Sequence, residues 1–210
     1  MVNVSYPGPP GLLSANPRRF MIRVGTAQQW FSVLPSTASQ QTWVPHPDGC
    51  ASSVVGNISD CGDSRGVWPF ESEDSDGFQE SKSSTWQAIG IYELYIEEHL
   101  GIDGNGFFGY DSVGLGESGP VTEHQVVAGV PTPNYWLGLL GLGANYTNFE
   151  HERPSSLLRT LKDEEKIPSL SYGYTAGAPY SKTSYYSGPV DRIFETYAHS
   201  SKDTQRLSAA

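Results

Sequence analysis

Short stretches in which apolar and polar residues alternate run through the middle of the chain, and Gly, Pro, Asn, Asp or Ser residues separate them. A period of two places one face of a strand against a core, so these stretches favour strands. Between them, residues 104–106 (Gly-Asn-Gly) have the composition of a hairpin turn, and residues 46–85 that of a loop. The pattern predicts strands at residues 19–24, 30–34, 42–45, 86–100, 107–115, 123–130 and 169–174.

One segment has helical periodicity instead. Leu157, Leu158 and Leu161 fall on one face of a helix. Either Ser155 or Ser156 can cap its N-terminus, and Pro168, at its far end, terminates it. We therefore expect a mostly β fold with one or two short helices.

The periodic segments define one domain, which we expect to span about residues 20–178. A composition of 37% hydrophobic and 12% aromatic residues in 210 residues is sufficient for a globular core. Residues 1–19 form an irregular N-terminal segment in this prediction. Residues 179–210 are polar, mixed in charge and without periodicity, so we expect an irregular or disordered tail.

The charge balance excludes some classes of partner. The chain has 13 basic and 23 acidic residues, which gives a formal net charge of −10. Such a surface repels phosphate backbones and anionic lipid, so we expect neither nucleic acid nor a membrane surface as a partner. No apolar run approaches the length of a transmembrane helix.

Two glycine motifs match functional patterns but lie in the wrong context. Residues 62–66 match G-x-S-x-G, yet a polar loop precedes them and Trp68-Pro69 follows, where a nucleophile elbow needs a strand and a helix. We interpret them as a surface turn. Residues 104–109 match G-x-G-x-x-G, but the following segment predicts a strand and not a phosphate-binding helix, which favours a hairpin turn.

The histidines and cysteines do not predict a metal centre. The five histidines show no metal-ligand spacing, and we expect His46 and His151 to lie on the surface. Cys50 and Cys61 have neither a second cysteine pair nor a histidine cluster, which favours a structural disulfide over zinc binding or redox chemistry. We expect no metal and no cofactor.

Three triplets have the sequence of an N-glycosylation acceptor, and they begin at Asn57, at Asn145 and at Asn3. Together with two cysteines that flank a polar loop, they favour the secretory pathway or the extracellular space. Residues 1–13 show no basic segment followed by an apolar one, so a signal peptide is not visible. One interpretation is that the sequence begins downstream of the true start.

The stretch from residue 24 to residue 45 contains motifs in a characteristic order. Residues 24–28 read Val-Gly-Thr-Ala-Gln, residues 31–39 read Phe-Ser-Val-Leu-Pro-Ser-Thr-Ala-Ser, and residues 42–45 read Thr-Trp-Val-Pro. This order resembles the opening of pepsin-like aspartic proteases (peptidase family A1). In that family a strand ending in Gly-Thr-Pro-x-Gln leads through an apolar strand into Asp-Thr-Gly-Ser and then into Leu-Trp-Val-Pro.

Further matches follow in the order of the family, up to about residue 178. Cys50 and Cys61 occupy the place of its first small disulfide loop. Residues 81–86 resemble its Ser-Ser-Thr-Phe turn, residues 109–113 the strand that leaves its flap, and residues 138–143 its Gly-Ile-Leu-Gly-Leu segment. The resemblance, to a divergent fungal-type member, implies the N-terminal lobe alone of a pepsin-like double-psi-type β-barrel.

The chemistry of this family depends on two carboxylates, one from each lobe, which share a proton and activate a water molecule. Ser36, Thr37 and Ala38 occupy the position of the first Asp-Thr-Gly. A serine cannot hold the charge that a general base needs, and Ala38 adds a methyl group where the family has glycine. The 210 residues hold no second Asp-Thr-Gly or Asp-Ser-Gly, so the resemblance provides no confident catalytic residue.

The sequence raises two further candidate roles at this site, those of a nucleophile and of a flap residue. Ser36 as a nucleophile would need a base within hydrogen-bond reach, and no motif pairs it with a histidine. An ungapped count back from Gly109 places His99 at the position of the flap tyrosine of the family. Tyr92 and Tyr95 lie nearby, so Tyr95 stays a second flap candidate.

The resemblance therefore predicts an aspartic-protease-like domain that is catalytically inactive and binds a peptide or a protein. Two alternatives stay open, namely a truncated form of an aspartic endopeptidase and a secreted or cell-surface interaction module. A lone lobe would expose apolar strand faces and edges. A homodimer that brings the Ser36 loops together, or a C-terminal lobe, would cover them.

Overall fold

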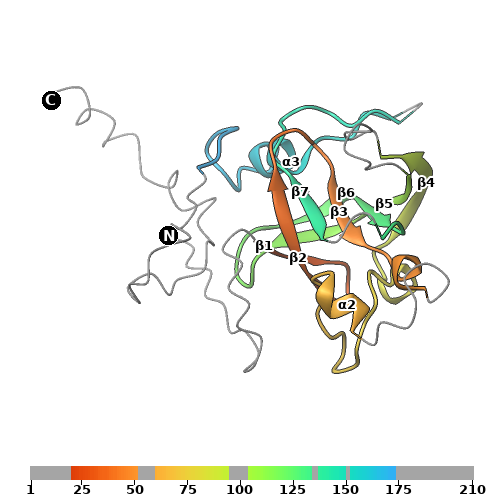
Figure 1. Cartoon of the computed structure of the whole chain (residues 1–210). Coiled ribbons are helices and arrows are strands. Elements are labelled where there is room, and N and C mark those ends of the chain that lie inside the picture. Colours follow the sequence, from red (N-terminus) through yellow and green to blue (C-terminus); the bar gives the residue numbers. More distant parts are fainter. Residues whose placement is uncertain (1–19, 52–59, 95–103, 134–136, 150–151, 174–210) are drawn as a thin grey trace, which may run out of the picture.

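The computed structural model describes residues 20–51, 60–94, 104–133, 137–149 and 152–173. Strands dominate these residues, and the helices among them are short (Figure 1). The elements in chain order are β1 (Phe20–Val24), β2 (Gln29–Ser36), β3 (Thr42–Pro45), the 3-10 helix η1 (Pro47–Cys50), α2 (Cys61–Ser64), the 3-10 helix η2 (Glu80–Lys82), β4 (Gln87–Glu93), β5 (Asn105–Leu115), β6 (Val121–Val130), β7 (Gly138–Gly141) and α3 (Leu157–Asp163).

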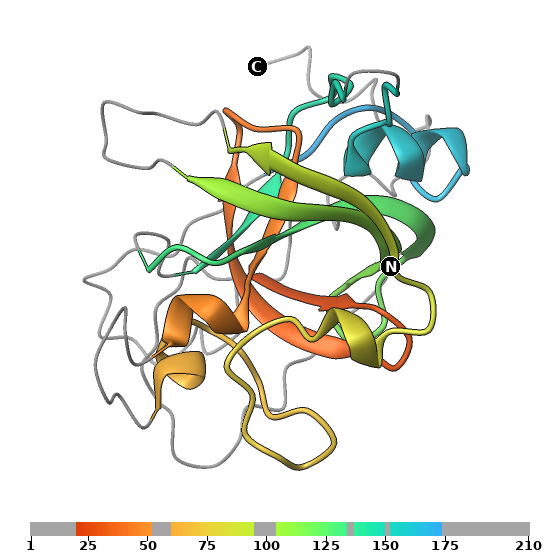
Figure 2. The same cartoon turned by 90° about the vertical axis from the view of Figure 1, so that its right-hand side faces the viewer.

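The strands form one sheet that closes on itself. Their order is β1-β2-β7-β3-β6-β5-β4, and β1 also pairs with β5. In the described part of the chain, six strands thus form a closed barrel, and β4 is an additional strand on β5. Figure 2 shows β4 and β5 as a long curved pair. The predicted mostly β fold of a single pepsin-like lobe is confirmed.

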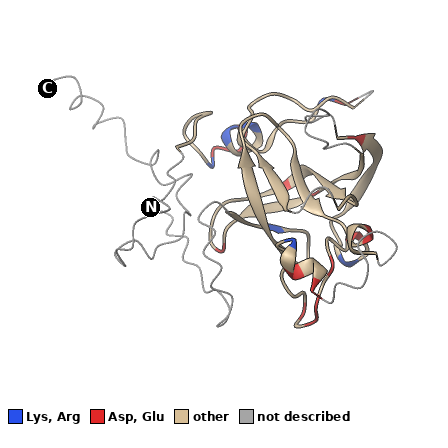
Figure 3. Cartoon of the chain, in the orientation of Figure 1, with Lys and Arg blue, Asp and Glu red and all other residues tan. Residues whose placement is uncertain are grey.

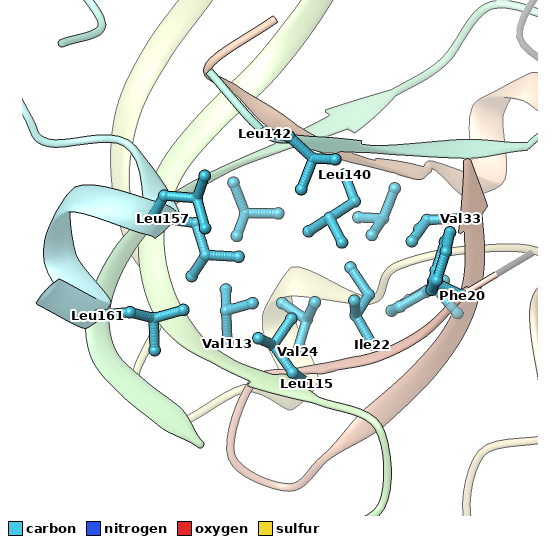
Figure 4. Packing of buried hydrophobic residues seen from close by; sticks show 14 of the residues in the cluster. Phe20, Ile22, Val24, Val33, Val113, Leu115, Leu140, Leu142, Leu157 and Leu161 are labelled. Carbon is cyan, nitrogen blue, oxygen red and sulfur yellow. The ribbon is translucent and has the colours of Figure 1, made fainter. Parts of the chain in front are cut away.

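The barrel interior contains the larger of two apolar clusters. Figure 4 shows Leu157 and Leu161 of α3 pointing into the same interior as Val113 and Leu115 of β5. Alternate residues of the strands fill the rest, because successive side chains point to opposite faces. The predicted helix is confirmed, and Ser156 is its cap, since its Oγ accepts a hydrogen bond from the backbone N of Arg159 at 3.4 Å. The predicted end at Pro168 is wrong, because α3 ends at Asp163 and Glu165 has a positive φ of 58°.

A second cluster covers the outer face of the sheet. On β6, Val127 belongs to the interior cluster, whereas its neighbours Val126 and Ala128 belong to the outer one. Phe108 and Phe149 pack together there, with ring centroids 5.2 Å apart. The sheet between residues 105 and 130 is therefore covered on both faces, which makes it a rigid support for the segments that it carries.

The predicted hairpin turn at residues 104–106 and the last predicted strand are also wrong. Asn105 and Gly106 lie within β5, where they pair with Glu93 and Tyr92, so the connection of the hairpin falls on residues that the structure does not describe. Pairing with β4 outweighs the local turn composition. Residues 169–173 form no strand, because they follow α3 as bends and irregular chain without a strand partner.

The interpretation of residues 62–66 as a surface turn is also wrong. They include α2, and Arg65, the next residue, is fully buried. Its guanidinium donates hydrogen bonds to the backbone oxygens of His46 at 3.1 Å, Val130 at 3.3 Å and Thr132 at 3.2 Å. Burial lowers the pKa of Arg65, and Asp76 opposes this shift. The segment thus anchors the ends of β3 and β6.

The predicted disulfide between Cys50 and Cys61 is confirmed. It joins the end of η1 to the start of α2, with the two Cα atoms 5.7 Å apart. The bond therefore closes a small loop next to the Arg65 anchor. No helix in the described ranges has the length and apolar character that crossing a bilayer requires.

Removing the disulfide is expected to weaken the domain. For a sequence separation of 11 residues, the loop-entropy estimate for a Cys50→Ala, Cys61→Ala variant is a loss of about 3 kcal/mol in the free energy of unfolding. Urea denaturation of the oxidised protein and of this variant measures the difference. Equal midpoints and slopes would show that the loop is ordered without its covalent link.

Candidate functional site

The loop between β2 and β3 is held in place by β7. This strand runs parallel to β2 and antiparallel to β3, so it occupies the gap between the two strands that residues 37–41 connect. Ser36 ends β2 and pairs with Gly141 at the end of β7. Together the loop and the three strands trace the letter ψ, and Ser36 lies where the loop begins.

Backbone hydrogen bonds fix this loop. The backbone N of Leu142 donates to the backbone O of Ser36, and the N of Gly143 donates to the O of Ser39, both at 2.8 Å. The Oγ of the buried Ser39 accepts from the backbone N of Gln41 at 3.0 Å. None of these three bonds uses the side chain of residue 36.

Glycines allow β7 to approach the loop. A Cβ on Gly141 would stand 2.4 Å from the backbone O of Gln41, and one on Gly143 would stand 2.9 Å from the O of Ser39. Such distances are too short for any larger residue without movement of the backbone. The glycine pattern of residues 138–143 therefore has a direct structural reason.

The three residues in the place of the catalytic triplet differ in exposure. Ser36 is half-buried, whereas Thr37 and Ala38 are exposed. The Oγ of Ser36 accepts a hydrogen bond from the backbone N of Ala38 at 3.3 Å, so it caps its own loop. Ala38 is not among the described residues with positive φ, and its methyl group is accommodated without strain.

The described surroundings of Ser36 provide no base for its hydroxyl. Among the described residues, the hydrogen bonds found for its hydroxyl include no imidazole and no carboxylate partner. A neutral hydroxyl donates and accepts hydrogen bonds but carries no charge with which to deprotonate water. The Ser36 loop can therefore hold a polar group of a ligand, whereas the water-activating step of the aspartic dyad needs a carboxylate.

Both predicted flap candidates, Tyr95 and His99, lie outside the described residues. The strands that would carry the flap, β4 and β5, are described and form an antiparallel pair. Tyr92 is part of this pair, and its ring packs 4.8 Å from that of Phe149. Tyr92 is therefore a component of the outer apolar cluster.

The prediction that His46 lies on the surface is wrong. Its side chain is only 16% exposed, and its ring centroid lies 4.6 Å from that of Phe107. Burial lowers the pKa of His46, the nearby Asp48 raises it, and Arg65 lowers it further. Arg65 also binds the backbone O of His46, so both the ring and the backbone of this residue are held by the fold. His151, the other histidine of this prediction, lies outside the described residues.

Glu80 lies on the same side of the barrel as His46. A Cβ on Gly129 would stand 3.2 Å from the Cδ2 of His46 and 3.7 Å from the Oε1 of Glu80. Burial raises the pKa of Glu80, and the charge of Asp48 raises it further. Other acidic residues gather on the loop after α2, where Figure 3 shows them, at Glu71, Glu73, Asp74 and Asp76.

Tyr110 joins the segment around residue 152 to β5. Its hydroxyl donates to the Oε2 of Glu152 at 2.6 Å, and its ring stacks on His124 with centroids 3.9 Å apart. Burial, this hydrogen bond and the charge of Glu152 raise the pKa of Tyr110 to about 12. The sequence contains no motif that indicates this cluster, because its residues come from three separate segments.

A closed barrel, a ψ-shaped loop at residue 36 and a small disulfide loop together define one lobe of the aspartic-protease type. Residues 20–193 match the sequence model of the family described as eukaryotic aspartyl protease. The chain belongs to this family, and the described residues form a single lobe, consistent with the N-terminal one. No curated protein matches the sequence. The predicted domain boundary at residue 178 stays a prediction.

Two predicted modification sites differ in what the structure says of them. Asn145 is exposed, whereas Asn57 lies outside the described residues.

Within the described ranges, no group of three or more His, Cys, Asp or Glu residues is arranged to hold a metal ion.

Substituting Gly141 is expected to displace the Ser36 loop. Because the new methyl group of Gly141→Ala would meet the Gln41 carbonyl, we expect a loss of about 1–3 kcal/mol in the free energy of unfolding. The control Ala38→Gly, at an exposed position of the same loop, is expected to cost under about 1 kcal/mol. Thermal denaturation of both variants tests the close packing, and equal losses would contradict it.

Glu80→Gln is expected to stabilise the domain near neutral pH. Folding raises the pKa of Glu80 above its usual 4.5. The protonated carboxyl group therefore makes its full contribution to stability at pH values below the usual pKa, and this contribution is lost as the pH rises through the pKa of the folded state. The amide avoids this loss. Melting temperatures at about pH 7 and about pH 3.5 are expected to show a gain at the higher pH alone, while the exposed Glu73→Gln serves as control. An equal gain at both values would refute the assignment.

Proposed function

We propose that this domain binds an extended peptide or a protein segment at the end of the barrel that carries Ser36 and does not cleave it. The observation that carries this proposal is the combination of a complete ψ-shaped loop with a serine at its first position. The scaffold is that of an aspartic protease, and the side chain is one that cannot do the chemistry.

The loss of one carboxylate is sufficient to remove the reaction. Groups that act as a unit lose nearly all of their effect when one is removed. Even if another lobe supplies its own aspartate, the hydroxyl of Ser36 neither shares a proton with it nor helps it to deprotonate water. The domain is therefore an inactive member of a protease family in this proposal.

Several exposed features favour binding of an extended segment. Thr37 and Ala38 are exposed, and Leu34, on the same strand as Ser36, is 37% exposed. β4 stands at one end of the strand order, with Ile91 62% exposed. A free strand edge binds an extended peptide through backbone hydrogen bonds, with side chains on alternate positions.

A second candidate is a protein surface that docks on the same end of the barrel. Leu34, on the strand that ends at Ser36, is 37% exposed and would lie within such a contact. A second copy of the chain or a C-terminal lobe would be such a surface. In either case the secretory pathway or the extracellular space is the proposed location, since the disulfide persists in oxidising compartments.

A peptide-retention experiment tests the first candidate. The oxidised full chain, made without glycans and immobilised, is incubated with a peptic digest of casein at about pH 4 and about pH 7, and bound peptides are identified by mass spectrometry. We expect enrichment of extended apolar peptides, recovered uncut. Thr37→Tyr is expected to abolish retention by blocking the exposed loop, and Thr37→Ser to preserve it.

Two results would overturn the proposal. New cleavage products that disappear in Ser36→Ala would show an active enzyme. Equal retention by the wild type and by Thr37→Tyr would show that the Ser36 loop is not part of the binding surface, and light scattering of the same samples then decides whether a second copy occupies it.

A further inference from the structure

Contacts with the rest of the domain hold the segment around Asn145 in place, although Asn145 itself is exposed. The Nε of Arg159 donates to the backbone O of Ala144 at 3.2 Å, and the guanidinium lies 4.7 Å from the ring centroid of Tyr146. Tyr146 also forms a bridge with Ser155. The segment is thus fixed on both sides of Asn145.

Thr147, the third residue of the acceptor triplet, is buried in the folded domain. It is only 3% exposed, and its backbone N donates to the O of Pro154 at 3.0 Å. An enzyme that glycosylates Asn145 must read the hydroxyl two residues further on, because the triplet is defined by that hydroxyl. In the folded domain Asn145 is exposed, whereas Thr147 is buried.

We propose that Asn145 carries an N-linked oligosaccharide and that the sugar is attached before this segment folds. The proposal rests on the secretory location within the proposed function. In the transfer, the amide nitrogen of Asn145 attacks the anomeric carbon of a lipid diphosphate-linked oligosaccharide. A C–N bond forms, the bond between that carbon and the diphosphate oxygen breaks, the lipid diphosphate leaves as an anion, and the amide proton passes to a base of the transferring enzyme.

The fold explains why the sugar must be attached before this segment folds. Before folding, Thr147 is exposed and the triplet is readable. After folding, the hydrogen bond from Arg159 to the backbone of Ala144 and the bridge between Tyr146 and Ser155 hold the segment in place, and Thr147 is buried. The attached sugar stays compatible with the fold, because Asn145 is exposed and a glycan is a surface modification.

Secretion from eukaryotic cells tests the site. The full chain is expressed behind a signal sequence in an Asn3→Gln, Asn57→Gln background, so that Asn145 heads the remaining triplet. We expect one oligosaccharide by intact mass, removed by peptide N-glycosidase. Thr147→Ser is expected to keep it, while Asn145→Gln and the isosteric Thr147→Val are expected to lose it. Secreted chain without a glycan at Asn145 would overturn the proposal.

A cell-free comparison tests the order. Chain made without glycans is either folded and oxidised or reduced, alkylated and unfolded, and each form is incubated with purified oligosaccharyltransferase and its lipid-linked donor. We expect the folded form to be modified at Asn145 at least about tenfold more slowly, because Thr147 must first be exposed by local opening. Equal rates would refute the order. Peptide retention is measured on chain without glycans, so neither result affects that test of the proposed function.

Discussion

The position of β7 between β2 and β3 is the constraint on which the rest of the site depends. Because β7 fills the gap that residues 37–41 span, the loop can follow only one path. Its carbonyls at Ser36 and Ser39 accept hydrogen bonds from Leu142 and Gly143. The barrel beneath adds rigidity, since β1 closes it by pairing with both β2 and β5. The geometry of the loop is thus a property of the backbone and of two glycines.

In the proposed function, the domain keeps the fold of the family without its reaction, and the backbone contacts of the loop are consistent with this. A carboxylate at position 36 would be required for the reaction of the family, whereas no hydrogen bond of the loop backbone to β7 requires one. The hydroxyl of Ser36 accepts a hydrogen bond from the backbone N of Ala38 in the same loop. Thr37 and Ala38 are exposed beside it, and this is the surface to which the proposal assigns the bound segment.

The sequence predicts the elements whose signal is local. Period-two alternation indicates most of the barrel strands, and Ser156 with three leucines indicates α3, because a strand face or a capped helix is encoded by its own residues. The buried Arg65, the partly buried His46 and the strand position of Asn105 were not predictable in this way. Their environments come from distant partners, namely the carbonyls of β3 and β6 for Arg65 and the pairing with β4 for Asn105.

Amide hydrogen exchange at Leu142 and Gly143 tests the central claim most directly. If the loop is fixed by its bonds to β7, these two amides exchange as slowly as those in the middle of β5 and β6, in the wild type and in Ser36→Ala alike. Fast exchange at both positions, or a loss of protection in Ser36→Ala, would contradict the account, because it would show that the shape of the loop depends on the side chain at position 36.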